Sequence, residues 1–321
     1  MKTLASQPII SIVICTYNRS KLLTRCLTHL LRSPIPSAGI EILVVDNNSS
    51  DNTRNVVNEF DSVCADKQNV ILRYILESNQ GLSNARNRGY LEAQGAWVAY
   101  LDDDAFVANN WVALTIENIR TLDSETVLFG AQVTPEPDTK VPDWAPDMFV
   151  RKPIEQGSQA KIKPNEARRL IAGSNMVILK KVLISLRGFD PALGIVKNSQ
   201  KGGEETELFF RLGKKGQIWF TPELVVYHPA TISDITLKKV LQRAWFGGLI
   251  ENKKRAWVNQ KRVQLIDLLS LPNAFRWFVL GLFYGILNFR FMNKKSVTCL
   301  ANSCHMLGLF VGFCKHMMKF S

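Results

Sequence analysis

Three consecutive carboxylates, Asp102, Asp103 and Asp104, follow an apolar run at residues 97–101. A short apolar run predicts a buried strand, and open α/β sheets bind their ligands at the carboxyl ends of their strands. Adjacent acids at such a place repel one another and are costly to desolvate. A divalent cation would offset that cost, and Mg²⁺ commonly joins carboxylates to substrate phosphates. The sequence therefore predicts a site for Mn²⁺ or Mg²⁺, with a solvated acidic turn as the alternative.

A second acidic group, Glu204, Glu205 and Glu207, follows two glycines at the start of a predicted helix. Acids at a helix N-terminus interact favourably with the helix dipole, which is the structural explanation for such a group. Three acids within four positions, preceded by Gly202 and Gly203, exceed what helix capping requires. The group is therefore a second candidate for chemistry.

The elements that must position these acids alternate along the chain. Continuous apolar, β-branched runs predict buried strands at residues 8–15, 40–45 and 70–75. Helical periodicity predicts helices between the strands at residues 20–32 and 53–60. Farther along, we expect a helix at residues 110–122 and strands at 126–134 and 218–227. Such strand–helix alternation is typical of a mainly parallel, doubly wound α/β sheet.

Polar clusters follow the predicted strand ends: TYNR at 16–19, DNNSSD at 46–51, NQGLSNARN at 79–87 and DDD at 102–104. Because the carboxyl ends of parallel strands share one edge of a sheet, these clusters are expected to meet in one crevice. Neither GxGxxG nor GxxxxGK[ST] is present, so the sequence lacks the glycines of a dinucleotide-binding site or a P-loop.

Individual residues in these clusters admit two interpretations each. Asp46 could accept hydrogen bonds from a base or ribose, or it could cap the next helix through an Asx turn. Gly81 permits close backbone approach or a positive φ. Arg86 could neutralise a phosphate, or it could belong to a solvated helix face. Tyr17 could stack on a base or be an aromatic at the edge of the core.

The segments SIVICTYNR, VVDNNSSD, NQGLSNARNRG and LDDDA, in this order, resemble the nucleotide-sugar half of family 2 glycosyltransferases. The resemblance implies a GT-A fold with a mixed, mainly parallel sheet flanked by helices, and transfer by single displacement with inversion. It implies that residues 1–106 bind a nucleoside-diphosphate sugar, with a UDP-sugar favoured. The residues that would line this donor are Thr16, Tyr17, Asn18, Arg19, Asp46, Asn48, Gly81, Asn84, Arg86, Asp102 and Asp103.

Residues 107–230 continue the resemblance and would bind the acceptor, a glycan or a lipid-linked glycan. The segment AGSNM at 172–176 and the GFD turn at 188–190 resemble the floor of the family's acceptor site. The residues implied on the acceptor side are Gly173, Ser174, Asn175 and Gly203.

The resemblance also implies the general base and the metal ligands. Family members usually carry Glu-Asp where this chain has Glu204 and Glu205, and the second acid of that pair removes the acceptor proton. Glu205 is therefore the implied base, one methylene longer than usual, with Glu204 as the alternative. The segment VVYHP resembles the place where a histidine approaches the metal. The implied ligands of Mn²⁺ or Mg²⁺ are Asp104, Asp102 and His228.

Residues 135–164 are rich in proline, charge and aromatic side chains, and they lack periodicity. We expect a long loop there, since compact domains seldom keep such a segment unless it is functional or mobile. It would either cover the substrate or face the acceptor; a plain surface insertion is the alternative.

The net charge of +12 is unevenly distributed. Residues 231–321 carry 14 Lys/Arg against 3 Asp/Glu, a net +11, which leaves +1 for residues 1–230. We therefore expect a GT-A catalytic domain at residues 1–230 and a basic, membrane-associating tail at 231–321, which would bind an anionic membrane surface. No zinc ribbon, recognition-helix motif or RNA-binding signature accompanies the charge, so no nucleic-acid partner is expected.

Within this tail, residues 237–257 predict a basic amphipathic helix suited to a membrane surface or to packing across the catalytic domain. The uncharged stretches 277–289 and 296–314 each contain GLFxG, the small-xxx-small spacing that lets helices approach closely in lipid. We expect a helical hairpin with its turn at 293–295 that dips into or lies on the bilayer. An oligomer interface of a soluble protein is the alternative.

Six scattered cysteines without a CxxC pair fit reduced thiols, and the first residues lack the long apolar core of a secretory signal. The expected location is the cytoplasmic face of the cell membrane, peripheral or monotopic. A role in assembling cell-surface polysaccharide or glycolipid follows from the apolar, basic tail.

Two other classes of protein are weighed against a glycosyltransferase. A sugar-1-phosphate nucleotidyltransferase would share a related sheet and acidic metal site, but it should begin with a glycine- and basic-rich phosphate loop, and residues 15–25 contain no glycine. A catalytically silent, membrane-associated nucleotide-sugar-binding module is the second. The retained acids argue against it.

Overall fold

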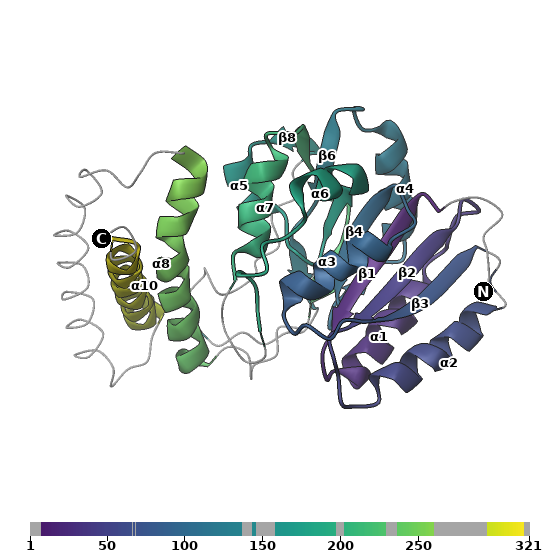
Figure 1. Ribbon diagram of the computed structural model, residues 1–321, viewed down its shortest axis with the longest axis horizontal. Helices are drawn as coiled ribbons and strands as arrows, with labels where there is room; N and C mark the ends of the chain where they lie inside the picture. Colours follow the sequence, from purple (N-terminus) through teal and green to yellow (C-terminus); the bar gives the residue numbers. More distant parts are fainter. Residues whose placement is uncertain are drawn as a thin grey trace. The chain divides into compact units, whose positions relative to one another are not determined.

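The computed structural model describes residues 8–65, 67, 69–136, 143–145, 158–196, 202–228, 236–259 and 294–317 (Figure 1). The chain divides into two compact units. The first comprises Met1–Pro135, Pro153–Lys197 and Glu204–Pro229, and the second comprises Glu136–Lys152, Asn198–Gly203 and Ala230–Ser321.

The first unit is built on an eight-stranded sheet of order β3-β2-β1-β4-β9-β6-β10-β8. Its first four strands are parallel: β1 (Ile10–Thr16), β2 (Ile40–Asp46), β3 (Val70–Leu76) and β4 (Trp97–Asp102). Beyond them, β9 runs antiparallel to its neighbours β4 and β6, β10 is parallel to β6, and β8 is antiparallel to β10. These four strands are β6 (Thr126–Gly130), β8 (Ala160–Ile162), β9 (Met176–Leu179) and β10 (Gln217–Phe220). The predicted mixed, mainly parallel α/β sheet is confirmed.

Helices cover both faces of this sheet because the parallel strands are apolar on both sides. Alternate residues of β1 enter different cores: Ile12 packs with the apolar side chains of α1 and α2, and Val13 packs with those of α3. Gly89 lets α3 lie close to β1, since a Cβ there would overlap the Val13 side chain. The helices of this unit are α1 (Ser20–Arg32), α2 (Thr53–Ala65), α3 (Leu82–Glu92), α4 (Trp111–Thr121), α5 (Pro164–Leu170), α6 (Lys180–Leu186) and α7 (Glu204–Leu212).

A small second sheet, of order β5-β11-β7, adjoins the end of β4. Its strands are β5 (Phe106–Val107), β7 (Val133–Pro135) and β11 (Val226–His228). Tyr227 on β11 lies opposite Phe106 on β5 in antiparallel register. Because β5 begins two residues after Asp104, this pairing brings the end of β11 to the acidic turn.

Three predicted elements differ from the structure. The strand expected at 218–227 is two strands, β10 in the large sheet and β11 in the small one. The single strand expected at 126–134 is two strands in two different sheets, because the chain leaves the large sheet after Gly130. There the Ala131 N–H donates to the Asn175 carbonyl, and the Ala131 carbonyl accepts from the Ala172 N–H, at 3.1 and 2.9 Å. The long loop expected at 135–164 contains β8, an edge strand too short to stand out in the sequence. Much of the remaining loop lies outside the described residues.

The second unit contains the helices α8 (Leu237–Asn259) and α10 (Lys294–Met317). They pack through small and apolar side chains, with Val240 and Ala244 of α8 against Val297 and Ala301 of α10. Gly248 permits the close approach, since a Cβ there would overlap the His305 carbonyl oxygen.

The apolar face predicted for α8 therefore lies against α10 over the described part of the pair. The stretch expected at 277–289 lies outside the described residues, and α10 begins within the turn expected at 293–295. Among the described residues, none of the helices combines the length and apolarity needed to cross a bilayer.

Candidate active site

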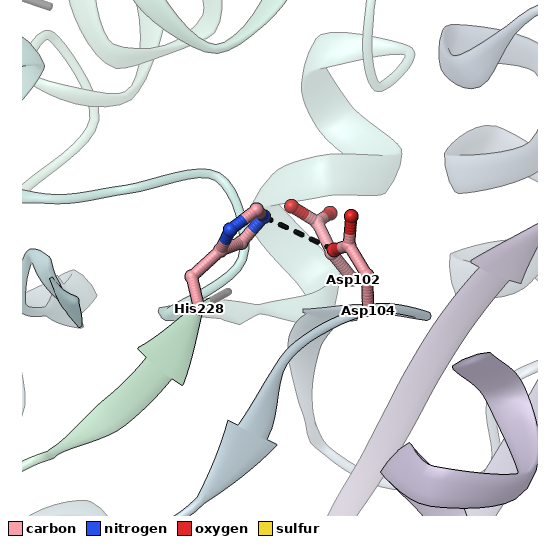
Figure 2. Close-up of side chains that lie close together, drawn as sticks. All are labelled: Asp102, Asp104 and His228. Atoms are coloured by element: carbon pink, nitrogen blue, oxygen red, sulfur yellow. Dashed lines mark ion pairs between the residues drawn. The ribbon is translucent and has the colours of Figure 1, made fainter. Parts of the chain in front are cut away.

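Two carboxylates and an imidazole converge at the end of β4. Asp102 ends β4, Asp104 lies in the turn that follows, and His228 ends β11. One ligand atom from each residue lies within 4.8 Å of the other two, and His228 Nε2 is 3.0 Å from Asp104 Oδ1 (Figure 2). Two carboxylate oxygens and a neutral imidazole nitrogen fit a divalent cation, and Mn²⁺ accepts such a mixed set more readily than Mg²⁺, which favours oxygen alone. The fold thus brings together the three residues that the sequence suggested as metal ligands.

An aromatic stack joins β5, which follows the acidic turn, to β11, which carries His228. The rings of Phe106 and Tyr227 stack with centroids 5.2 Å apart and an interplanar angle of 24°. The guanidinium of Arg25, from α1, lies 4.5 Å from the Phe106 centroid. Because Tyr227 adjoins His228, the stack fixes the imidazole relative to the acidic turn.

Arg19, from the cluster that follows β1, bridges the two later acids. Its Nη1 lies 3.1 Å from Asp103 Oδ1 and 3.0 Å from Asp104 Oδ2. Asp103 is buried, and this burial raises its pKa to about 7; the positive charge of Arg19 opposes the shift and the negative charge of Asp104 adds to it. Arg19 therefore compensates part of the negative charge of this turn.

A second cluster joins the acids of α7 to the end of β4 through Arg86. Arg86 Nη1 lies 3.1 Å from Glu204 Oε1 and 3.2 Å from Glu205 Oε1, and its Nη2 is 3.8 Å from Asp102 Oδ1. Gly173 lies directly beside this contact. A Cβ at Gly173 would overlap Glu205 Oε1 and come within 2.8 Å of Arg86 Nη2. The lack of a side chain at Gly173 thus makes room for the ion pair.

The two glutamates of this cluster differ in environment. Glu204 is 2% exposed, and its Oε2 is buried without a hydrogen-bond partner within the described chain. Burial, together with the negative charge of Glu205, raises the pKa of Glu204 to about 8, against the opposing effect of Arg86. The Glu205 side chain, in contrast, is 26% exposed. A reacting molecule can therefore reach Glu205 and not Glu204.

The predicted nucleotide end lies on the same edge of the sheet. Asp46 is paired in register with Thr16, and Asp102 with Cys15, so Asp46 and Asp102 flank the end of β1. With neighbouring strands about 4.8 Å apart, their backbones are about 10 Å apart. The four predicted clusters thus meet at one sheet edge.

Asp46 is held in place by two hydrogen bonds. Its Oδ1 accepts from the Ser49 N–H at 2.8 Å, and its Oδ2 accepts from the Tyr74 hydroxyl at 2.7 Å. The first bond closes a local turn but does not cap the next helix, because the Thr53 N–H that begins α2 donates to Asp51 Oδ1 at 3.1 Å. Asn18 and Asn48 adopt left-handed φ angles of 53° and 67° in the adjoining turns.

Asn47, which is not among the predicted site residues, connects two of these turns. Its side-chain amide donates to the carbonyls of Glu77 and Asn79, and its Oδ1 accepts from the Gly81 N–H at 2.7 Å. Gly81 itself has a φ of 138°. The sequence signal for Asn47 is its position directly after a buried strand, between the predicted site residues Asp46 and Asn48.

The remaining predicted residues lie around this edge with varied exposure. Tyr17 is half-buried, and the Asn84 side chain donates to the Gln80 carbonyl at 3.3 Å. Asn175 is fully buried: its Oδ1 accepts from Trp111 Nε1, and its Nδ2 donates to backbone carbonyls, which is a scaffold role. Ser174 is buried beside Asn175, and Gly203 precedes α7 with a φ of 100°.

Three features together define a GT-A fold: the sheet order, the acidic turn after β4 and the acids that begin α7. The carboxylates gather at one edge of the sheet. The family model for glycosyl transferase family 2 matches residues 11–186, which is more than half of the chain. The chain belongs to glycosyl transferase family 2. The predicted family, fold class and enzyme class are thereby confirmed.

Similar proteins agree with this assignment. The glycosyltransferase AglE of Haloferax volcanii is 23% identical over 279 residues, 85% of this chain and 81% of that protein. Several further curated relatives match over less than half of their own length. One similar solved structure is the mannosyltransferase PcManGT from Pyrobaculum calidifontis in complex with GDP-Man and Mn²⁺. It is 15% identical to this chain with a TM-score of 0.61, and the match covers 96% of this chain and 87% of that one. TarS residues 1–349 from S. aureus, in complex with UDP-GlcNAc, is 14% identical with a TM-score of 0.54, covering 92% and 90%.

Proposed function

We propose that this family 2 glycosyltransferase moves a sugar from a nucleoside-diphosphate sugar to an acceptor hydroxyl in a reaction that needs Mn²⁺ or Mg²⁺. The observation that carries the proposal is the convergence of Asp102, Asp104 and His228 beside the carboxylate of Glu205. The two groups are linked through Arg86. The nucleotide sugars and the Mn²⁺ named for the two similar solved structures support a donor of this chemical class.

Glu205 acts as the general base in the proposed reaction. Its carboxylate accepts the proton of the acceptor hydroxyl as that oxygen forms a bond to the anomeric carbon. The bond between this carbon and the diphosphate oxygen breaks with both electrons on the oxygen, and attack from the opposite face inverts the anomeric configuration. When held by Asp102, Asp104 and His228, a divalent cation supplies positive charge beside the departing diphosphate. The exposure of Glu205 and the burial of Glu204 support the choice of base.

A donor screen tests this proposal. The wild-type chain is incubated with Mn²⁺ and, in turn, with UDP-glucose, UDP-galactose, UDP-N-acetylglucosamine and GDP-mannose, and release of the nucleoside diphosphate is measured. We expect slow hydrolysis of one donor, with water as acceptor, that stops when EDTA removes the metal. Release of pyrophosphate from a nucleoside triphosphate and a sugar 1-phosphate would instead identify a nucleotidyltransferase. Donor hydrolysis that persists in EDTA would remove the metal from the mechanism.

We further propose that the second unit binds an anionic membrane at the cytoplasmic face and that the acceptor is lipid-linked or a growing polysaccharide. The net charge of residues 231–321 supports this, as do Lys238 and Arg243, which are exposed on α8 while its apolar side packs on α10. We expect the full chain to sediment with phosphatidylglycerol vesicles and not with phosphatidylcholine vesicles. Replacing Lys238 and Arg243 by glutamate should weaken the binding. Equal binding to both kinds of vesicle would contradict an electrostatic contact.

A further inference from the structure

Arg86 is buried more deeply than a phosphate-binding side chain should be. The residue is 2% exposed, and its guanidinium lies 5.4 Å from the ring centroid of Phe189 and 6.0 Å from that of Tyr100. An arginine that recognises phosphate presents the N–H groups of its fork to the ligand. Here the rings and the surrounding acids enclose the fork.

The guanidinium N–H groups of Arg86 point at carboxylates of the protein. Nη1 contacts both Glu204 and Glu205, and Nη2 faces Asp102. Burial by itself lowers the pKa of Arg86, but the charges of Glu205, Glu204 and Asp102 outweigh burial and raise it. The guanidinium therefore stays charged, and the acids would lose their compensating charge without it.

One oxygen of Glu205 is used in this contact and the other is not. Oε1 is the atom that lies against Arg86, and within the described part of the chain no hydrogen bond to Oε2 is present. The gap that Gly173 leaves lies beside the same Oε1. A carboxylate fixed through one oxygen presents its second oxygen in a defined direction, as a general base requires.

We propose that Arg86 is a positioning residue that holds Glu205 for proton removal, ties it to the strand end that carries Asp102, and does not bind the phosphates of the donor. This inference rests on the proposed function. It assigns Arg86 to the acceptor-activating half of the reaction, whereas the family resemblance placed it with the diphosphate.

The test separates turnover from donor binding. In Arg86→Lys the charge remains but the fork is lost, so Glu205 is no longer held at the same angle. We expect kcat for donor hydrolysis to fall about 100-fold, since a misplacement of about 1 Å has that effect on a catalytic group. The donor KM, and the Kd for UDP or GDP with Mn²⁺ measured by calorimetry, should stay within about threefold of the wild-type values.

Two further variants complete the design. Arg88→Lys changes an arginine on the same helix whose partner is Glu92 at 2.9 Å, and it should leave kcat and Kd unchanged. Gly173→Ala keeps Arg86 but places a methyl group against Glu205 Oε1, and it should lower kcat without weakening nucleotide binding. If Arg86→Lys does not fold, as judged by its melting curve, Gly173→Ala decides the question.

The outcomes are distinct. A Kd for the nucleoside diphosphate raised more than about tenfold in Arg86→Lys would show that Arg86 binds phosphate and would overturn the inference. Wild-type kcat in Arg86→Lys or, should that variant not fold, in Gly173→Ala would overturn it as well. If the wild-type chain turns over none of the donors, the proposed function fails. The nucleotide affinity of the variants still reports whether Arg86 contacts the diphosphate.

Discussion

Asp104→Ala is expected to abolish sugar transfer while the protein remains folded. Asp104 Oδ1 contacts His228 and Asp104 Oδ2 contacts Arg19. The substitution therefore removes one oxygen ligand of the proposed cation, and it also removes an ion-pair partner of both His228 and Arg19. A bound cation contributes several kcal/mol of charge stabilisation, and each ~1.4 kcal/mol is tenfold in rate, so we expect a loss of at least about 1,000-fold. The side chain lies in the turn after β4, outside both hydrophobic cores of the first unit, and the melting temperature should change little.

Two measurements check this prediction. Donor hydrolysis is compared between the wild type, Asp104→Ala and Asp61→Ala, which removes an exposed acid from α2 and serves as the control. Mn²⁺ binding is followed by the electron paramagnetic resonance signal of the free ion, and its affinity should fall in Asp104→Ala alone. Unchanged Mn²⁺ affinity in that variant would show that the cation is held elsewhere. Turnover near the wild-type rate would remove Asp104 from the mechanism.

The half of the fold that the sequence predicted well is the half in which local signals and tertiary structure agree. Parallel strands buried on both faces must be apolar throughout, and amphipathic helices must separate them. The helix α1 shows its buried side through regularly spaced leucines, and the acids after β4 mark the carboxyl edge. Once the strand ends are known, the meeting of TYNR, DNNSSD and DDD follows from the parallel arrangement.

The parts that the sequence could not predict depend on contacts between distant segments. The chain turns from β6 into β7 because backbone groups of Ala131 pair with Ala172 and Asn175, and no local pattern specifies that pairing. The helix α3 has few apolar residues to mark its buried side, so its periodicity does not show that Arg86 is buried and Arg88 is not. In the structure Arg86 is buried among acids, whereas Arg88 is exposed. Only the fold, which brings α7 to α3, distinguishes them.

Glu205→Gln is the variant that identifies the general base. Glutamine keeps the shape of the side chain, and its amide oxygen can still accept from Arg86, but it cannot take up the acceptor proton. We expect kcat to fall about 100- to 10,000-fold, the range that general-base catalysis contributes, with nucleotide affinity unchanged. Initial rates and calorimetric titration with the nucleoside diphosphate measure the two quantities separately.

The neighbouring acids of the same helix turn supply the matched comparisons. Glu204 is 2% exposed and lies behind Arg86 at 3.1 Å, so an acceptor hydroxyl does not reach its carboxylate, and Glu204→Gln should lose much less activity than Glu205→Gln. Glu207 pairs with Arg211 away from Arg86, so Glu207→Gln should retain activity within about threefold. If Glu204→Gln proved inactive and Glu205→Gln active, the base would be the buried glutamate. In that case the acceptor would have to displace Arg86 from Glu204 before reaction, because Arg86 and the surrounding residues now shield that carboxyl.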